Sequence, residues 1–244
     1  AQGRHVQSAG CRYAQLDVED VTEEAVGDLR EDARAVTVDD LTFDVATAGP
    51  DDGAPVMLLH GFPDRATLWS PQIACLVDAG YRVVSYDQRN HGVSEVGDLE
   101  HCTIDQLGRD LRAVIDATTN EGELVLVRHS MGGMIAAPYT QRHPETLTAT
   151  VLSGPVLGSW EPTALADLDE IPPTPIDITT LSRDPDVGRA YEADELVWHG
   201  DFKRPTLLAL RACLEAITRG GRLTVPTIWL HGADDQLVPI DRSD

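Results

Sequence analysis

Short apolar runs rich in β-branched residues recur along the chain from about residue 36, and longer segments of helical periodicity separate them. Runs of this length and composition predict strands, and the segments between them predict helices. The predicted strands are LTFDVAT (41–47), PVMLLH (55–60), YRVVSY (81–86), ELVLV (123–127), LTATVLS (147–153) and VPTIWLH (225–231). The predicted helices lie near 67–79, 104–118, 131–143 and 205–219.

Several of the predicted strands are apolar at both alternating positions, which is the pattern of strands buried on two faces. Regular alternation of strands and helices predicts an α/β fold with a doubly wound, mostly parallel sheet. The length of 244 residues fits one such domain. Ligands bind such sheets at the carboxyl ends of the strands, so the residues that follow each strand are the first candidates for a site.

Two segments interrupt this rhythm. Residues 1–35 are acidic with few apolar positions, and we interpret them as a solvated N-terminal extension. Residues 154–204 are rich in Pro, Asp and Thr and separate two core parts, 36–153 and 205–244. We expect this insertion to form a cap over the strand ends, although a disordered loop is the alternative. Three apolar side chains favour the cap because a disordered loop would not need them: Tyr191, Leu196 and Trp198.

The charge of the chain is strongly negative. Asp and Glu number 41 against 19 basic residues, which gives a formal charge of −22, and Lys203 is the single lysine. This charge repels nucleic acids and anionic lipid surfaces, and it makes the folded chain self-repelling unless salt screens it. A very acidic surface with few lysines resembles proteins of salt-loving archaea. A moderately acidic bacterial protein is the alternative.

Membrane, metal and redox functions find little support in the sequence. No apolar run reaches the roughly 18 residues of a membrane span, and no apolar segment of a signal peptide is visible. The four cysteines are scattered and form no CxxC pair, so we expect reduced thiols in a cytoplasmic protein and no metal site.

The segment LVLVRHSMGGMIAAPY, residues 124–139, is the main candidate for chemistry. A predicted buried strand leads directly into Ser130, and a helix of small residues follows. A sharp turn of this kind would lift the serine hydroxyl above the sheet, where the N–H of Met131 and the helix N-terminus can stabilise an oxyanion. An ordinary serine cap of a helix is the alternative.

This segment resembles the nucleophile elbow of α/β-hydrolases, G-x-S-x-G, which reads GHSMGG in many members. The resemblance makes Ser130 the catalytic nucleophile and places His129, Gly132 and Gly133 in the elbow. Arg128 stands where the first glycine is usual. Because that position is crowded against neighbouring backbone, we expect the arginine either to turn outward or to distort the elbow.

Two further motifs resemble the same family. LLHGFPD, at 58–64, resembles the H-G-x-P oxyanion loop, with His60 and Gly61 in the loop and Phe62 as the second donor of a backbone N–H. We expect His60 to organise this loop and not to transfer protons. SYDQRNHGVS, at 85–94, resembles the D-x-R-G-H-G-x-S loop, in which four polar side chains build loop structure: Asp87, Arg89, His91 and Ser94.

IWLHGADDQLVP, at 228–239, resembles the segment that carries the acid of the Ser-His-Asp triad. The family pattern assigns the acid to Asp235, with Asp234 as the alternative, and its role is to orient the catalytic imidazole. The family histidine follows the acid, yet no histidine follows Asp235 in this sequence. We therefore expect a C-terminally truncated chain that lacks the triad histidine and the last strand and helix. His199, in the insertion, is a remote substitute.

Serine at the elbow argues against epoxide hydrolases and haloalkane dehalogenases, which use aspartate there. VLSGPVLG (151–158) and LSRDPDVGRAYEADELVWHG (181–200) resemble segments of monoacylglycerol lipases and lysophospholipases. This resemblance implies cofactor-free hydrolysis of a small-molecule ester with a single acyl chain through an acyl-enzyme. Cofactor-free haloperoxidases and carbon–carbon bond hydrolases share the triad and are one alternative. A catalytically silent homologue is the other.

Overall fold

The computed structural model describes residues 34–39, 41–62, 64–92, 94, 103–119, 123–195, 197 and 199–240. Most of the acidic N-terminal segment, residues 1–33, lies outside this part of the chain, and so do Leu196 and Trp198, two of the three proposed anchors of the cap. Arg34 and Ala35, assigned above to the extension, are the first residues of strand β1.

One open, mostly parallel sheet of seven strands forms the centre of the described fold, in the order β1-β2-β4-β3-β5-β6-β7. The first two strands pair antiparallel, β2 is also antiparallel to β4, and the remaining pairs are parallel. The predicted α/β fold class is therefore confirmed. The strands are β1 (Arg34–Val38), β2 (Leu41–Ala48), β3 (Pro55–Leu59), β4 (Arg82–Tyr86), β5 (Leu124–His129), β6 (Leu147–Ser153) and β7 (Thr227–Leu230).

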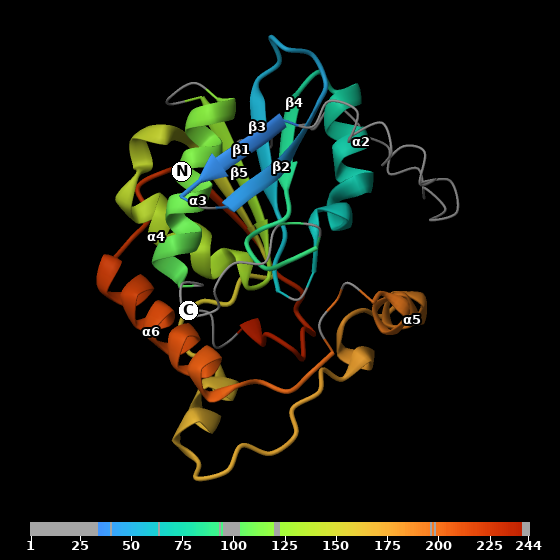
Figure 1. Ribbon diagram of the computed structural model, residues 1–244, viewed down its shortest axis with the longest axis vertical. Coiled ribbons are helices and arrows are strands. Elements are labelled where there is room, and N and C mark those ends of the chain that lie inside the picture. Colours follow the sequence, from blue (N-terminus) through green and yellow to red (C-terminus); the bar gives the residue numbers. More distant parts are fainter. Residues whose placement is uncertain are drawn as a thin grey trace, which may run out of the picture.

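Helices cover both faces of the sheet (Figure 1). Helices α3 and α4 lie on one face, α2 lies on the other, and α6 packs against α4. Their bounds agree with the four helices predicted from periodicity: α2 (Ser70–Asp78), α3 (Ile104–Thr118), α4 (Gly132–Arg142) and α6 (Arg204–Gly220). A 3-10 turn, η2 (Ala66–Trp69), precedes α2, and another, η4 (Pro144–Thr146), precedes β6.

Strand β3 shows why its sequence is apolar at every position. Met57 and Leu59 pack into the core beneath α3 and α4, whereas Val56 and Leu58 pack into a second core with Trp69, at the start of α2. All four β3 side chains are almost fully buried. Successive side chains of a strand point to opposite faces, so a strand covered on both sides needs apolar residues throughout.

The segment between β6 and α6 contains three short helices and lies beyond the carboxyl ends of the strands (Figure 1). They are η5 (Glu161–Asp167), η6 (Ile178–Thr180) and α5 (Pro185–Ala193). Arg211 of α6 forms a two-pronged ion pair with Asp167, and Arg204 donates hydrogen bonds to three carbonyl groups at the end of η5. These bonds attach the insertion to α6.

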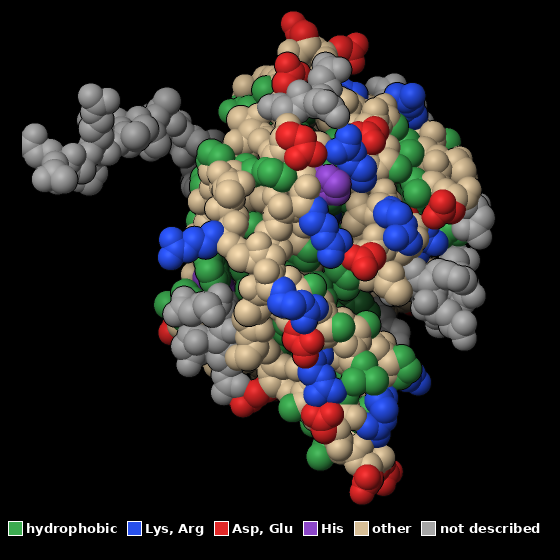
Figure 2. Space-filling model, turned by 90° about the vertical axis from the view of Figure 1, so that its left-hand side faces the viewer, with side chains coloured by type: hydrophobic (Ala, Val, Ile, Leu, Met, Phe, Trp, Pro, Cys, Tyr) green, Lys and Arg blue, Asp and Glu red, His purple; other side chains and the backbone are tan. Residues whose placement is uncertain are grey.

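The described surface includes a face of mixed charges and an apolar edge strand. On the face formed by α3, α4 and α6, basic and acidic side chains are interspersed (Figure 2), and ion pairs such as Arg142–Asp105 and Arg112–Asp116 connect them. Strand β7, at the opposite edge from β1, is exposed. Its side chains Ile228, Trp229 and Leu230 are 56%, 40% and 55% accessible to solvent.

Candidate active site

Ser130 occupies a tight turn between strand and helix. Strand β5 ends at His129, α4 begins at Gly132, and Ser130 has a φ of +53°, in the left-handed region. Its N–H donates to the carbonyl of Ser153 at 2.9 Å, and its own carbonyl accepts from the N–H of Gly133 at 2.9 Å. A non-glycine residue rarely adopts this conformation, and it does so here because hydrogen bonds fix both sides of the turn.

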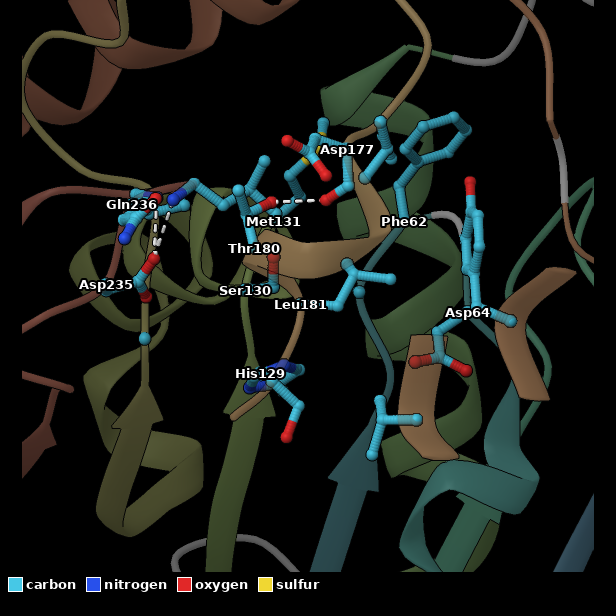
Figure 3. Close-up of a pocket in the computed structure, with 18 of the residues that line it drawn as sticks. Phe62, Asp64, His129, Ser130, Met131, Asp177, Thr180, Leu181, Asp235 and Gln236 are labelled. Atoms are coloured by element: carbon cyan, nitrogen blue, oxygen red, sulfur yellow. Dashed lines mark hydrogen bonds between the residues drawn. The ribbon is translucent and has the colours of Figure 1, made fainter. Parts of the chain in front are cut away.

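Glycines allow the oxyanion loop to pack directly against this turn. A Cβ on Gly61 would lie 2.7 Å from the carbonyl oxygen of His129 and 3.2 Å from the peptide nitrogen of Met131. A Cβ on Gly132 would lie 2.9 Å from the carbonyl oxygen of His60. Side chains at these two positions would separate the two segments, which is the physical reason for glycine. The close packing brings Phe62, Ser130 and Met131 to the same cavity (Figure 3).

Arg128 does not turn outward, and Ser130 keeps its left-handed turn, so both outcomes expected for this arginine are wrong. Its side chain is fully buried on the face of β5 that α3 and α4 cover, and one N–H donates to the carbonyl of Gly132 at 3.1 Å. Its Nε and Nη2 atoms have no hydrogen-bond partner among the described residues. Burial lowers the pKa of Arg128 to about 10, and the phenols of Tyr86 and Tyr139 partly offset this effect. Arg128 is therefore a charged group in the core at neutral pH.

His60 connects the oxyanion loop to the loop after β4. Its side chain is fully buried, Nδ1 lies 2.9 Å from the carbonyl of Gly61, and Nε2 lies 2.9 Å from the N–H of Gln88. A carbonyl can only accept and an N–H can only donate, so the proton resides on Nδ1. Burial, and then the nearby His91, lower the pKa of His60 to about 4. Neutral His60 is thus a structural group in this loop.

The loop after β4 is held by its polar side chains. Arg89 forms a two-pronged ion pair with Asp110 of α3, both N···O distances being 2.9 Å, and both side chains are buried. Asp87 accepts the N–H of Ala66 at 2.6 Å, and the Ser94 hydroxyl donates to the Asp87 carbonyl. Asn90, which replaces the family glycine, has a φ of +61°, a conformation that asparagine tolerates better than most residues.

Asp235 and Asp234 lie in different environments. One carboxylate oxygen of Asp235 accepts the N–H groups of Leu237 and Val238 at 3.0 and 2.8 Å, and its side chain is 25% exposed. Asp234 is 76% exposed and forms an ion pair with Arg183 of the insertion. The half-buried carboxylate that faces the cavity beside Ser130 therefore belongs to Asp235 (Figure 3).

His231 fixes the loop that carries Asp235. Its Nε2 donates to the carbonyl of Val238 at 2.7 Å, its Nδ1 accepts from the indole N–H of Trp229 at 3.2 Å, and Nε2 lies 3.6 Å from Asp235 Oδ2. The motif IWLHGADD contains this histidine, but the sequence alone did not indicate that it supports the acid.

A cavity of about 2280 Å³ lies above Ser130 and is covered by the insertion. Phe62, Ser130, Met131 and Asp235 all line it, so the structure brings these predicted residues together. His129 is the one histidine among its described lining residues. Burial lowers the pKa of His129, which is also hydrogen-bonded to the backbone of Ser153. His199 lies outside the cavity, where its Nε2 donates to the carbonyl of Asp194.

Three features of the described residues bear on what the site can hold and where the chain can lie. No group of three or more His, Cys, Asp or Glu side chains is arranged to hold a metal ion in this part of the chain. None of the described helices combines the length and the apolar character of a membrane span. Two cysteines that the structure describes, Cys75 and Cys213, are free thiols.

Comparisons with known proteins agree with this architecture. Residues 51–244 match the family described as serine aminopeptidase S33. The chain belongs to this family of α/β-hydrolases. It is 29% identical over 214 residues to a monoacylglycerol lipase of Mycolicibacterium smegmatis, an alignment that covers 82% of this chain and 76% of that lipase. It is 28% identical over 216 residues to a non-heme chloroperoxidase of Kitasatospora aureofaciens, covering 78% and 77% of the two chains.

Among solved structures, this α/β-hydrolase resembles the monoacylglycerol lipase of Paleococcus ferrophilus with a TM-score of 0.70 and 26% identity. The match covers 82% of this chain and 81% of that one. Sequence motifs identified Phe62, Ser130, Met131 and Asp235 as candidates, and these residues line one cavity. The motifs missed the ion pairs that connect the insertion to the core at the cavity, Arg65–Asp194 and Arg183–Asp234, because the partners are far apart in the sequence and no local pattern relates them.

Proposed function

We propose that this chain is a carboxylic ester hydrolase that acts on small or single-acyl-chain esters through Ser130. The observation that supports this most strongly is the left-handed turn of Ser130 at a large cavity that Phe62 and Met131 also line. In the proposed reaction Ser130 Oγ gives its proton to a base and attacks the ester carbonyl, and the N–H groups of Phe62 and Met131 stabilise the oxyanion. The C–O bond to the alcohol then breaks, the alcohol takes up the proton, and water releases the acid from the acyl-enzyme and restores Ser130. Loss of one such donor costs roughly 3–4 kcal/mol of barrier.

Proton transfer is the demanding step for this chain. We assign to Asp235 the role of orienting an imidazole, but no described side chain is hydrogen-bonded to Ser130 Oγ. Serine is a poor nucleophile without a neighbouring base. We therefore infer that turnover by this chain is slow and limited by deprotonation of Ser130, and that a base supplied from solution accelerates it.

Chemical rescue tests this proposal. Hydrolysis of a short-chain p-nitrophenyl ester and of a monoacylglycerol is measured in molar KCl with increasing imidazole, for this chain and for Ser130→Ala. The Ser130→Ala protein corrects for hydrolysis by imidazole itself. We expect turnover that depends on Ser130 and rises with imidazole. Equal rates for the two proteins at every imidazole concentration would contradict the proposal and favour a catalytically silent homologue.

Similarity to a chloroperoxidase supports a second candidate, cofactor-free halogenation with the same serine site. The two activities are separated by offering the protein bromide, peroxide and a halogen acceptor beside the ester. Ester hydrolysis is expected to dominate because the cavity is large and is lined by apolar side chains of the core and the insertion, which suits an acyl chain. Preferential halogenation would reverse this assignment.

The chemistry of the surface supports a proposal about the environment. With a formal charge of −22 and one lysine among 19 basic residues, the chain is suited to a cytoplasm of high salt concentration. The free thiols of Cys75 and Cys213 are consistent with a reducing compartment. We therefore place its proposed activity in a salt-rich cytoplasm.

A further inference from the structure

The charged groups of the cavity are unevenly distributed. Its described lining contains six carboxylates and two arginines: Asp64, Glu161, Asp177, Asp194, Asp234 and Asp235, with Arg65 and Arg183. Each arginine is ion-paired, Arg65 with Asp194 at 2.9 Å and Arg183 with Asp234. Both arginines already lie beside a carboxylate, so the described lining offers an anionic substrate group no cation without a neighbouring negative charge.

Asp64 is the carboxylate closest in sequence to the oxyanion loop. It follows Phe62 by two residues, and Figure 3 shows Asp64 and Asp235 on opposite sides of Ser130. One Asp64 oxygen accepts the N–H of Arg65 at 3.0 Å, which fixes the side chain at the cavity wall. Burial is the main cause that raises the pKa of Asp64, and the charge of Asp194 adds to it. Where water is partly excluded, a second negative charge is repelled more strongly than in bulk solvent.

The rest of the lining is suited to a hydrocarbon chain. Apolar side chains from the core and from the insertion face the cavity, among them Leu68, Trp160, Leu165, Ile176, Leu181 and Phe202. Trp160 and Phe202 meet edge to face with ring centroids 5.6 Å apart, and Phe202 lies against Phe62 with ring centroids 6.2 Å apart. A ligand with one apolar chain and an uncharged polar head would fit both the apolar lining and the carboxylates of the cavity.

We propose that Asp64 is a specificity-determining residue that selects, together with the other cavity carboxylates, against esters whose alcohol carries a phosphate or another anion. The preferred substrate of the proposed hydrolase is then an uncharged single-chain ester of the monoacylglycerol kind, and lysophospholipid-like esters with an anionic head are excluded. This inference rests on the proposed function, because the selected ligands are substrates only if the chain hydrolyses esters. The selectivity of the cavity for binding does not depend on turnover.

Binding of ether analogues tests the selection without chemistry. Decyl glycerol ether and its phosphate monoester have the same chain, cannot be hydrolysed at the ether, and differ in charge. Their affinities for the full chain are measured by calorimetry below their micelle concentrations, in 0.05 M and 1 M KCl. The variant is Asp64→Asn, which keeps an oxygen for the Arg65 N–H. Asp169→Asn is the matched control, because Asp169 lies in the insertion but outside the cavity lining.

We expect the neutral ether to bind at least roughly tenfold more tightly than the phosphate in 0.05 M KCl, because the carboxylates of a cleft that partly excludes water repel the anion. The ratio should fall about threefold or more in Asp64→Asn, and in the unchanged chain it should stay above one in 1 M KCl, because partly buried charges are screened much less than exposed ones. Asp169→Asn should leave the ratio unchanged.

Three results would overturn the proposal: equal or tighter binding of the phosphate at low salt, binding of neither ether, or the same affinity ratio in Asp64→Asn as in Asp169→Asn. The rescue experiment on ester turnover is independent of this one. If Ser130-dependent turnover is absent while the affinity ratio behaves as expected, the ester hydrolase assignment fails and the charge selection by Asp64 stands.

Discussion

Arg128 places a positive charge in the core directly behind the turn of Ser130, with a single hydrogen bond to the Gly132 carbonyl. Buried N–H groups without partners each cost about 1–3 kcal/mol. Replacing Arg128 by methionine, which has a similar length and no charge, should therefore raise the free energy of unfolding by about 1–3 kcal/mol. Urea denaturation of the two proteins measures this difference.

Arg128→Gly is the informative companion, because it restores the family residue but removes a large buried side chain. The resulting cavity should lower the free energy of unfolding by about 2–4 kcal/mol. Since Ser130 already has its left-handed conformation with Arg128 present, no gain in Ser130-dependent turnover is expected. A loss of stability in Arg128→Met would mean that the guanidinium has partners that compensate its burial.

His60 makes stability depend on pH. Its pKa is about 4 in the folded protein and about 6.5 in an unfolded chain, so the unfolded chain binds more protons between these values. The contribution of neutral His60 is complete above pH 6.5 and declines by about 3 kcal/mol as the pH falls to 4.

Comparison with His60→Gln, which does not titrate, isolates this effect in denaturation curves at pH 7, 5.5 and 4. The variant is expected to be less stable at pH 7, where the native hydrogen bond to the Gln88 N–H is intact. The difference should shrink as the pH falls. A difference that stays constant across the range would show that His60 does not control the acid sensitivity.

At the scale of elements, glycines in two helices should respond in opposite ways to alanine. A Cβ on Gly133 of α4 would lie 2.7 Å from Pro155 in the segment after β6, whereas a Cβ on Gly108 of α3 would have no atom within 4 Å. We expect Gly133→Ala to destabilise the protein by about 1–3 kcal/mol through overpacking. Gly108→Ala should stabilise it by about 0.5–1 kcal/mol because alanine favours the helix. Thermal unfolding of both variants checks the two signs, and a stable Gly133→Ala protein would contradict the packing of α4 on that segment.

The elements of the sheet could be predicted because burial on both faces leaves a direct trace in the sequence, as the continuous apolar run of β3 shows. The three short helices of the insertion leave no such trace, since their positions depend on contacts such as Arg211–Asp167 across 44 residues. The motifs identified Ser130 and Asp235 as candidates. They could not reveal that the Arg128 side chain points into the core, because this depends on the room available beneath α4, near Tyr86 and Tyr139.

For the whole molecule, the charge of −22 predicts a strong dependence of stability on salt. The screening length falls from about 10 Å at 0.1 M salt to about 3 Å at 1 M, so repulsion among surface carboxylates weakens as the KCl concentration rises. We expect the melting temperature to increase between 0.1 and 2 M KCl. A chain with several exposed acids changed to lysine is the control and should respond less. Equal melting temperatures at both salt concentrations would argue against a salt-adapted surface.

The exposed strand β7 makes the association of molecules, as well as their stability, depend on salt. Ile228, Trp229 and Leu230 present an apolar sheet edge, and such edges pair readily with those of neighbouring molecules. At low salt the negative charge keeps the molecules apart in solution. The salt that relieves repulsion within one molecule also relieves it between two. The same rise in KCl that stabilises the folded chain should therefore promote its self-association, which light scattering would detect.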